Sequence, residues 1–196
     1  MIRTHLILGT ILLGICFGRG ADAGDKRNQK SIENYVVPDV VLTDQNGIRV
    51  NLKNLLQTNK PVMLDFIYCS CTTTCPVLST TYANIQNRIA PDTQRVQLVS
   101  ISVDPVNDTP QAMKGYLNRY HAKPGWEFLT GSIEEIDKVL KAFRIKEMSY
   151  NYFTLIRSSP DTKWAKITGH LNVTEVVDEY LKEAGNHLLR PTNSGP

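Results

Sequence analysis

Two apolar runs in the first half of the chain predict strands that are covered on both faces. The runs occupy residues 61–67 and 95–103. Apolar runs of this length are typical of central strands in a sheet that has helices on both sides. Shorter strands, bounded by turn residues, are predicted at 36–43, 48–51, 126–129, 152–156 and 164–167.

Helices are predicted between these strands, because apolar residues recur there at spacings of three and four. Pro76 and the pair Thr109-Pro110 mark helix starts, since proline is tolerated in the first turn and a threonine side chain can accept a backbone N–H. Strands alternating with helices, after an N-terminal hairpin that turns at 44–47, predict one α/β domain with a central mixed sheet flanked by helices. The predicted helices are 52–56, 76–89, 110–120, 133–143 and 173–181.

The first residues have the pattern of a targeting segment. A basic start is followed by an apolar run at 6–17 and then by Ala21-Asp22-Ala23, which fits a small-x-small cleavage pattern. A spanning helix needs about 20 apolar residues, so a cleaved signal peptide is favoured over a retained anchor. We therefore expect export to a periplasm or to the outer face of the cytoplasmic membrane. The predicted divisions are a signal peptide at 1–23, a flexible leader at 24–34, a folded domain at 35–189 and a flexible tail at 190–196.

Composition and charge narrow the classes of function. A hydrophobic fraction of 41% and a charged fraction of 21% are ordinary for a globular protein. The formal net charge is +3, and the basic residues are scattered along the chain. Because they form no basic stripe, nucleic acid is excluded as an expected partner. A monomer that works close to a membrane is expected.

Three of the four cysteines, Cys69, Cys71 and Cys75, lie within seven consecutive residues. Thiols this close together cannot link distant parts of a fold, so they react, bind metal or close very small loops. Cys71 and Cys75 lie where the strand at 61–67 gives way to the helix at 76–89. Free N–H groups and partial positive charge at a helix start stabilise thiolate, which attacks disulfides and binds soft metals. The pair is therefore the predicted reactive site, with Cys71 as the attacking thiol.

The residues around this pair leave alternatives open. Cys71 and Cys75 could instead be inert buried cysteines or a plain structural disulfide. Cys69 is either a third sulfur ligand or resolving thiol, or a cysteine that packs at the end of a strand. Asp104, at the end of the second central strand, either lines the site or forms a turn with Pro105.

The chain resembles the Sco (SenC) family of thioredoxin-like copper proteins over about residues 37–181. The stretches that carry the resemblance are Phe66-Ile-Tyr-Cys-Ser-Cys-Thr-Thr-Thr-Cys-Pro76, Ser102-Val-Asp-Pro105 and Asp108-Thr-Pro110. The resemblance implies a thioredoxin-like fold, Cys71 and Cys75 as copper-binding, redox-active thiols, and Asp104 as an acidic residue lining the site. It also implies that the protein loads copper into the binuclear centre of cytochrome c oxidase, or reduces the disulfide in that subunit.

The chain departs from this family at one copper ligand. The family has a histidine before the penultimate strand, and Tyr150 falls at that position when 148–155 is aligned to the region. The sequence has no histidine between His121 and His170. Two thiolates can hold Cu(I), which is soft and tolerates low coordination, but would hold Cu(II) poorly. Copper, as Cu(I), is therefore the predicted metal.

Two main hypotheses for function follow. The first is a metallochaperone that passes copper to an exported partner such as a cytochrome c oxidase subunit. The second is a thiol-disulfide oxidoreductase that acts on an exported partner's cysteines without stable copper binding. A peroxide-reducing protein on the same fold is a weaker third hypothesis, because no arginine or glutamine partner for a single peroxidatic cysteine is evident.

Overall fold

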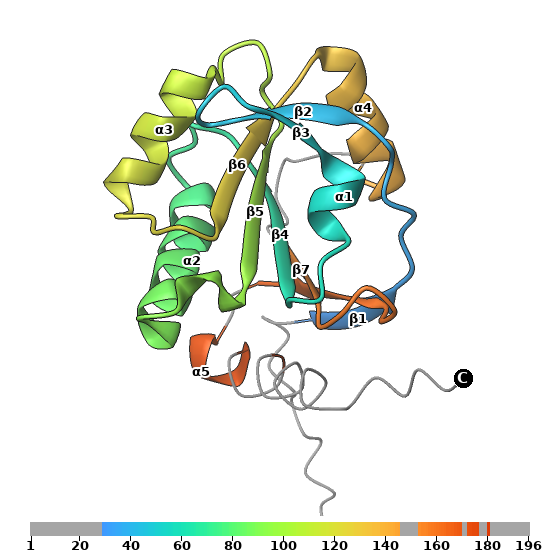
Figure 1. The fold of residues 1–196 in the computed structure, drawn as a ribbon, viewed down its shortest axis with the longest axis vertical. Helices are drawn as coiled ribbons and strands as arrows, with labels where there is room; N and C mark the ends of the chain where they lie inside the picture. The colour runs from blue at the N-terminus through green and yellow to red at the C-terminus, as the bar shows by residue number, and fades with distance from the viewer. Residues whose placement is uncertain (1–28, 146–152, 170–171, 177–179, 181–196) are drawn as a thin grey trace, which may run out of the picture.

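The computed structural model describes residues 29–145, 153–169, 172–176 and 180, which form one mixed sheet with helices on both faces (Figure 1). The order of the described strands is β1-β8-β7-β4-β5-β6-β2-β3. β4 pairs parallel with β5, and β5 pairs parallel with β6, whereas the remaining neighbours are antiparallel. The strands are β1 Gln29–Glu33, β2 Val41–Asp44, β3 Arg49–Asn51, β4 Val62–Ile67, β5 Gln97–Ser102, β6 Trp126–Thr130, β7 Phe153–Arg157 and β8 Trp164–Thr168.

The helices divide between the two faces of the sheet. α2 and α3 lie over one face, and α1 and α4 lie over the other (Figure 1). The 3-10 turn Thr93–Arg95 precedes β5. The helices are α1 Leu52–Leu56, α2 Cys75–Ile89, α3 Pro110–Arg119, α4 Ile133–Ala142 and α5 Val173–Val176. Among the described helices, none combines the length and the apolar character needed to cross a membrane.

The two apolar runs form the centre of the sheet, as the sequence predicts. Every residue of β4 is buried, because α2 covers one face of the strand and α4 covers the other. Met63 and Ile67 pack on the α2 face, whereas Leu64 and Phe66 pack on the opposite face. The alternation of side chains along a strand therefore divides one hydrophobic run between two core clusters.

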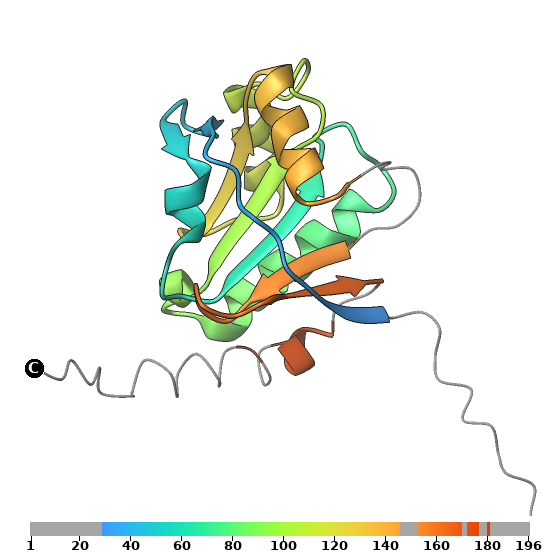
Figure 2. The ribbon, with the colours of Figure 1, turned by 90° about the vertical axis from the view of Figure 1, so that its right-hand side faces the viewer.

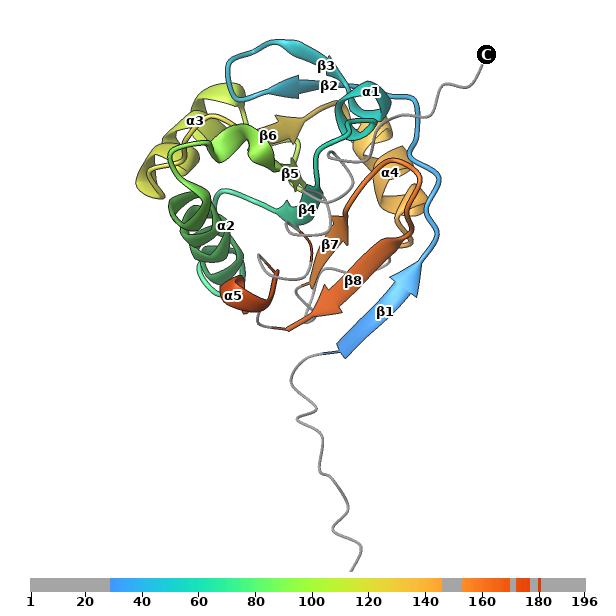
Figure 3. The same ribbon diagram turned by 60° about the horizontal axis from the view of Figure 1, so that its bottom comes forward.

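Part of the segment predicted to be a flexible leader, 24–34, is a strand instead: residues 29–33 form β1. Residues 29–33 pair antiparallel with β8 at the outer edge of the sheet (Figure 3). This strand is polar and mostly exposed, so it lacks the apolar signal of a buried strand. It forms because the backbone of β8 offers an open edge to pair with, and backbone pairing requires no hydrophobic sequence.

The strand predicted at 36–43 is shorter in the structure and begins at Val41. The preceding segment, 34–40, crosses the face that carries α1 and α4 on its way from β1 to β2 (Figure 2). Tyr35 packs there against Phe143, with ring centroids 5.3 Å apart. The apolar residues of this segment therefore contribute to the core without strand pairing. The hairpin of β2 and β3 is confirmed.

The parallel strands bring two distant loops together. β4 and β5 run in the same direction, so the loops that follow them leave the same edge of the sheet. The Val103 N–H donates to the Ile67 carbonyl at 3.1 Å, which ties the loops at their starts. The cysteine segment at 68–75 and the acidic segment at 104–108 are consequently neighbours. The predicted signal peptide, the predicted tail and residues 177–179 and 181 of the predicted helix at 173–181 lie outside the described residues.

Candidate functional site

The structure brings Cys71 and Cys75 together at the junction of β4 and α2, as predicted. Cys75 is the first residue of α2, and Pro76 follows it in the first turn. Thr74 precedes the helix but makes no side-chain capping bond. Instead, the Cys75 N–H donates to the Sγ of Cys71 at 3.4 Å. The sulfur of Cys71 therefore occupies the position of a capping acceptor, where an N–H of the helix start favours its thiolate form.

Hydrogen bonds make Cys71 the more acidic thiol. Burial by itself raises the pKa of Cys71. Hydrogen bonds from the thiol and N–H of Cys75, together with the Thr73 N–H and the Thr74 hydroxyl, outweigh burial and lower the pKa of this thiol from 9.0 to about 6. Cys71 is therefore largely thiolate at neutral pH, as a nucleophile or a ligand for a soft metal must be.

Cys75 has the opposite character. Its side chain is 2% exposed, against 7% for Cys71. Burial raises the pKa of Cys75 to about 12, and the hydrogen bond with Cys71 and the charges of Cys71 and Asp65 act in the same direction. The two thiols thus form an asymmetric pair, with one sulfur ionised at the loop and one protonated sulfur at the start of the helix.

Cys69 is not grouped with this pair. Its N–H donates to both carboxylate oxygens of Asp108, at 3.1 and 3.3 Å. Burial, followed by the charge of Asp108 and a hydrogen bond with it, raises the pKa of Cys69 to about 12. Within the part of the chain that the structure describes, no three His, Cys, Asp or Glu side chains could hold one metal ion. The described residues therefore do not gather the three sulfurs into one group, and the backbone of Cys69 is held by Asp108.

Asp104 lies in the neighbouring loop and is half-buried. Its two carboxylate oxygens accept hydrogen bonds from the Asn107 amide, both at 2.9 Å, and its N–H donates to the Ser102 hydroxyl at 3.0 Å. The pKa of Tyr68 is raised mainly by the negative charge of Cys71 and then by a hydrogen bond with that sulfur. The charge of Asp104 raises it further, but by less. Asp104 thus acts on the cysteine loop through its charge, whereas Asp108 bonds to that loop directly. Tyr150 lies outside the described residues.

Asp65 is a buried carboxyl that the sequence reasoning missed. It lies in the middle of β4 with 0% exposure, and neither carboxylate oxygen has a hydrogen-bond partner of normal geometry among the described residues. Burial raises the pKa of Asp65 from 3.8 to about 7, and the Ser100 hydroxyl offsets this only in part. A charged residue inside an apolar strand is the sequence signal that could have found it, because such a residue is almost never buried without a reason.

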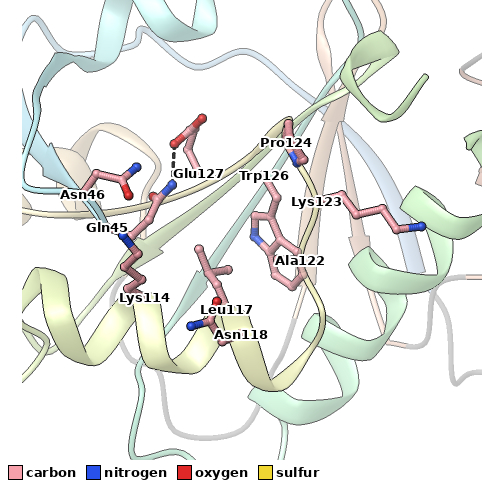
Figure 4. A pocket seen from close by; sticks show the side chains of 10 residues that line it. All are labelled: Gln45, Asn46, Lys114, Leu117, Asn118, Ala122, Lys123, Pro124, Trp126 and Glu127. Atoms are coloured by element: carbon pink, nitrogen blue, oxygen red, sulfur yellow. Dashed lines mark hydrogen bonds between the residues drawn. The ribbon is translucent and has the colours of Figure 1, made fainter. Parts of the chain in front are cut away.

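A surface hollow of about 350 Å³ lies away from the cysteines (Figure 4). It is formed by the turn at Gln45 and Asn46, the exposed side of α3 and the start of β6. Gln45 bridges the hollow by donating to Glu127 at 2.9 Å. Its lining is mainly polar and contains none of the cysteines.

Comparison with known proteins agrees with this arrangement. The SCO1/SenC family matches residues 28–154. The SCO1 protein homolog of Bacillus subtilis is 32% identical over 142 residues, which cover 71% of this chain and 69% of that protein. Arabidopsis thaliana ScoI, solved with copper bound, is 28% identical, with a TM-score of 0.60 and coverage of 77% of this chain and 99% of that one.

A second similar structure is that of a protein with a disulfide switch. BsSco, a member of the Sco family of cytochrome c oxidase assembly proteins in which a disulfide switch was identified, is 26% identical. Its TM-score is 0.65, and the match covers 80% of this chain and 98% of that chain. These likenesses confirm the thioredoxin-like α/β fold expected from the sequence. By the family match and by the identity with the Bacillus protein, this chain belongs to the SCO1/SenC family.

Proposed function

We propose that this protein is a copper-binding Sco-type metallochaperone. It takes up Cu(I) at the thiolates of Cys71 and Cys75 and serves the assembly of the copper centre of cytochrome c oxidase. The observation that carries the proposal is the capping contact at the start of α2, where the Cys75 N–H donates to the Cys71 sulfur. Relatives that are named as copper-bound Sco proteins and as cytochrome c oxidase assembly proteins support it.

The donor set fits Cu(I) as the cargo. Both ligands are soft sulfur atoms, and soft thiolates select Cu(I), which accepts low coordination numbers. Among the described residues, no histidine, aspartate or glutamate side chain joins the two sulfurs in a three-ligand group. The residues therefore match Cu(I) better than Cu(II). The predicted signal at 1–23 supports a site of action outside the cytoplasm, in a periplasm or at the outer face of the cytoplasmic membrane. The proposed receiving partner is an exported oxidase subunit.

Chelator competition tests the proposal. Reduced protein is titrated with Cu(I) against a colorimetric Cu(I) chelator, alongside Cys71→Ala and Cys75→Ala. We expect one Cu(I) per chain, loss of this binding in either variant, and weak binding of Cu(II). Cys69→Ala is the matched control and keeps the site, because Cys69 is bound to Asp108 instead. Absence of Cu(I) binding above background in the reduced protein would refute the proposal.

A second function is favoured by the asymmetry of the pair. A pKa of about 6 at Cys71 and about 12 at Cys75 suits an attacking thiolate and a protonated resolving thiol. In that function Cys71 attacks a disulfide of an exported partner, and Cys75 then releases the partner. Cys75→Ser should accumulate a mixed disulfide through Cys71, which mass spectrometry detects. A mixed disulfide through Cys69 in that variant would contradict this assignment.

A further inference from the structure

Three thiols lie within seven residues, yet only two of them form the reactive pair. Cys69 is separated from Cys71 by Ser70 alone. Exchange between thiols depends on which sulfur can reach the bond under attack. The selective use of Cys75 therefore requires that the Cys69 sulfur be kept from reacting with Cys71.

The backbone of Cys69 is fixed on both sides. Its N–H donates to the two carboxylate oxygens of Asp108 at 3.1 and 3.3 Å. Its carbonyl accepts a hydrogen bond from the Nη2 of Arg119 at 3.4 Å. The Asp108 carboxylate is a charged acceptor, which strengthens its bonds relative to those between neutral groups, whereas the exposed Arg119 contact is longer and weaker. The peptide groups around Cys69 are consequently held by α3 and by the loop that precedes it.

Asp108 is itself rigidly placed. It is 2% exposed, and its Oδ2 accepts the Ser102 hydroxyl at 2.6 Å. Its N–H donates to the Asp104 carbonyl at 2.9 Å. Ser102 is the last residue of β5 and is fully buried. The carboxylate that holds Cys69 is thus anchored to the central sheet.

Cys71 depends on a different set of contacts. Its N–H donates to the Tyr68 carbonyl at 3.2 Å, and its sulfur accepts the Cys75 N–H at 3.4 Å. Neither contact involves Asp108. Two cysteines only two positions apart are therefore directed by separate parts of the fold, one by the β5–α3 loop and one by the start of α2.

We propose that Asp108 is a positioning residue that determines which two of the three thiols act, by holding Cys69 away from Cys71. This inference rests on the proposed use of Cys71 and Cys75. In disulfide exchange, the partner's disulfide is the oxidant. The Cys71 thiolate attacks one of its sulfurs, the partner's S–S bond breaks, the other sulfur leaves as thiolate, and Cys71 is joined to the partner in a mixed disulfide. With Cys69 held, the sulfur of Cys75 forms the new bond to Cys71, its proton leaves to solvent, and the partner departs as thiolate. With Cys69 released, Cys69 carries out the same step and yields a Cys69–Cys71 disulfide.

Disulfide mapping tests the assignment. Reduced protein is oxidised with glutathione disulfide, free thiols are alkylated, and the linked peptides are identified by mass spectrometry. The wild type should give Cys71–Cys75 with Cys69 alkylated. In Asp108→Ala, disulfides that include Cys69 should rise about tenfold, because hydrogen bonds to a charged acceptor are lost. Ser102→Ala should shift the products in the same direction by less, and it decides the question if Asp108→Ala does not fold.

A double variant separates positioning from a general effect on the loop. Asp108→Ala combined with Cys69→Ser should restore clean closure of Cys71 with Cys75, because the competing thiol is gone. Asp137→Ala, at an exposed aspartate of α4, is the control and should give the wild-type pattern. The proposal is overturned if folded Asp108→Ala leaves Cys69 unlinked, or if the double variant still closes poorly. Cu(I) competition on the reduced wild type is the separate arm. Absence of Cu(I) binding there refutes the proposed function, whereas the disulfide map alone judges the role of Asp108.

Discussion

Two aspartates are buried near the cysteine pair, and they differ in every contact. Asp108, at the edge of the sheet, receives hydrogen bonds from Ser102 and from the backbone of Cys69. Asp65, in the centre of β4, has no hydrogen-bond partner of normal geometry among the described residues. Burial of a charge is tolerated when hydrogen bonds replace water, and is costly when they do not. The first carboxyl therefore organises a loop, whereas the second is a cost within the fold.

The polar groups around Asp65 do little to offset the free-energy cost of its burial. Ser100 lies opposite it on β5, and continuing the register of β4 with β7 places Thr154 on its other side. The Ser100 hydroxyl already accepts the Trp126 indole N–H at 3.0 Å. The hydroxyls of Thr154 and of Tyr82, which comes from α2, also lack partners among the described residues. An unsatisfied polar layer thus lies on the sheet face that α2 covers, and such layers often mark functional sites.

The largest expected effect is the pH dependence of stability that Asp65 imposes. Its pKa is about 7 in the folded protein and 3.8 without burial, so the folded state holds a proton that the unfolded state has released between these values. Stability should therefore fall as pH rises from about 4 to about 7, by up to roughly 4 kcal/mol in all. Asp65→Asn should remove this slope and be more stable at pH 8. Urea unfolding at pH 5 and pH 8 measures it, and an unchanged slope in the variant would contradict the account.

Asp108→Ala should lower the free energy of unfolding, the opposite of the change expected for Asp65→Asn at pH 8. The substitution leaves the Ser102 hydroxyl and the Cys69 N–H without their acceptor. Leaving buried donors unsatisfied costs about 1–3 kcal/mol each, so a loss of about 3 kcal/mol in the free energy of unfolding is expected. Asp108→Asn keeps one acceptor oxygen and should lose less. Urea unfolding at one pH compares the variants, and a stabilising Asp108→Ala would break the contrast between the two aspartates.

The third prediction concerns the thiols that lie between these aspartates. In protein carrying Cys69→Ser, which keeps the Cys75 thiol as a hydrogen-bond donor to Cys71, the iodoacetamide rate of Cys71 should rise with a midpoint near pH 6. At pH 7 the thiolate fraction should exceed that of an ordinary cysteine by more than about tenfold. Because the charge of Asp65 raises the pKa of Cys75, Asp65→Asn should lower the midpoint of Cys75 when it is measured in Cys71→Ser. A Cys71 midpoint near 9 would show that the hydrogen bonds at the helix start do not act.

The smallest effect is expected from Thr154→Val. The change replaces a buried, unsatisfied hydroxyl with a methyl group of the same shape. Removing such a hydroxyl should be neutral or stabilising by less than about 1 kcal/mol. Thermal unfolding of Thr154→Val, alone and combined with Asp65→Asn, measures any coupling between the two side chains. A strong loss of stability would mean that Thr154 does bond to Asp65, and the contrast with Asp108 would weaken.

Much of the fold could be predicted because its signals are local. The apolar residues of β4 and β5, the proline at the start of α2 and the Thr109 cap of α3 are all visible in short stretches. β1 could not be predicted in this way, since its polar residues are fixed by an edge that β8 provides. The reactive pair was predictable for the same local reason, as both cysteines flank one strand-to-helix junction. The roles of Asp108 and Asp65 were not, because their partners come from other strands and loops.

The order of residues alone shows that three thiols lie near the start of a helix, because chain connectivity places residues 69–75 there. Which of the three work together is set by contacts in the folded protein. That choice depends on a parallel pairing of β4 with β5, which brings Asp108 to Cys69 across a separation of 39 residues. Hydrogen bonds and burial depend on neighbours in space, so the order of residues along the chain cannot assign a pKa of about 6 to one cysteine and about 12 to the other two.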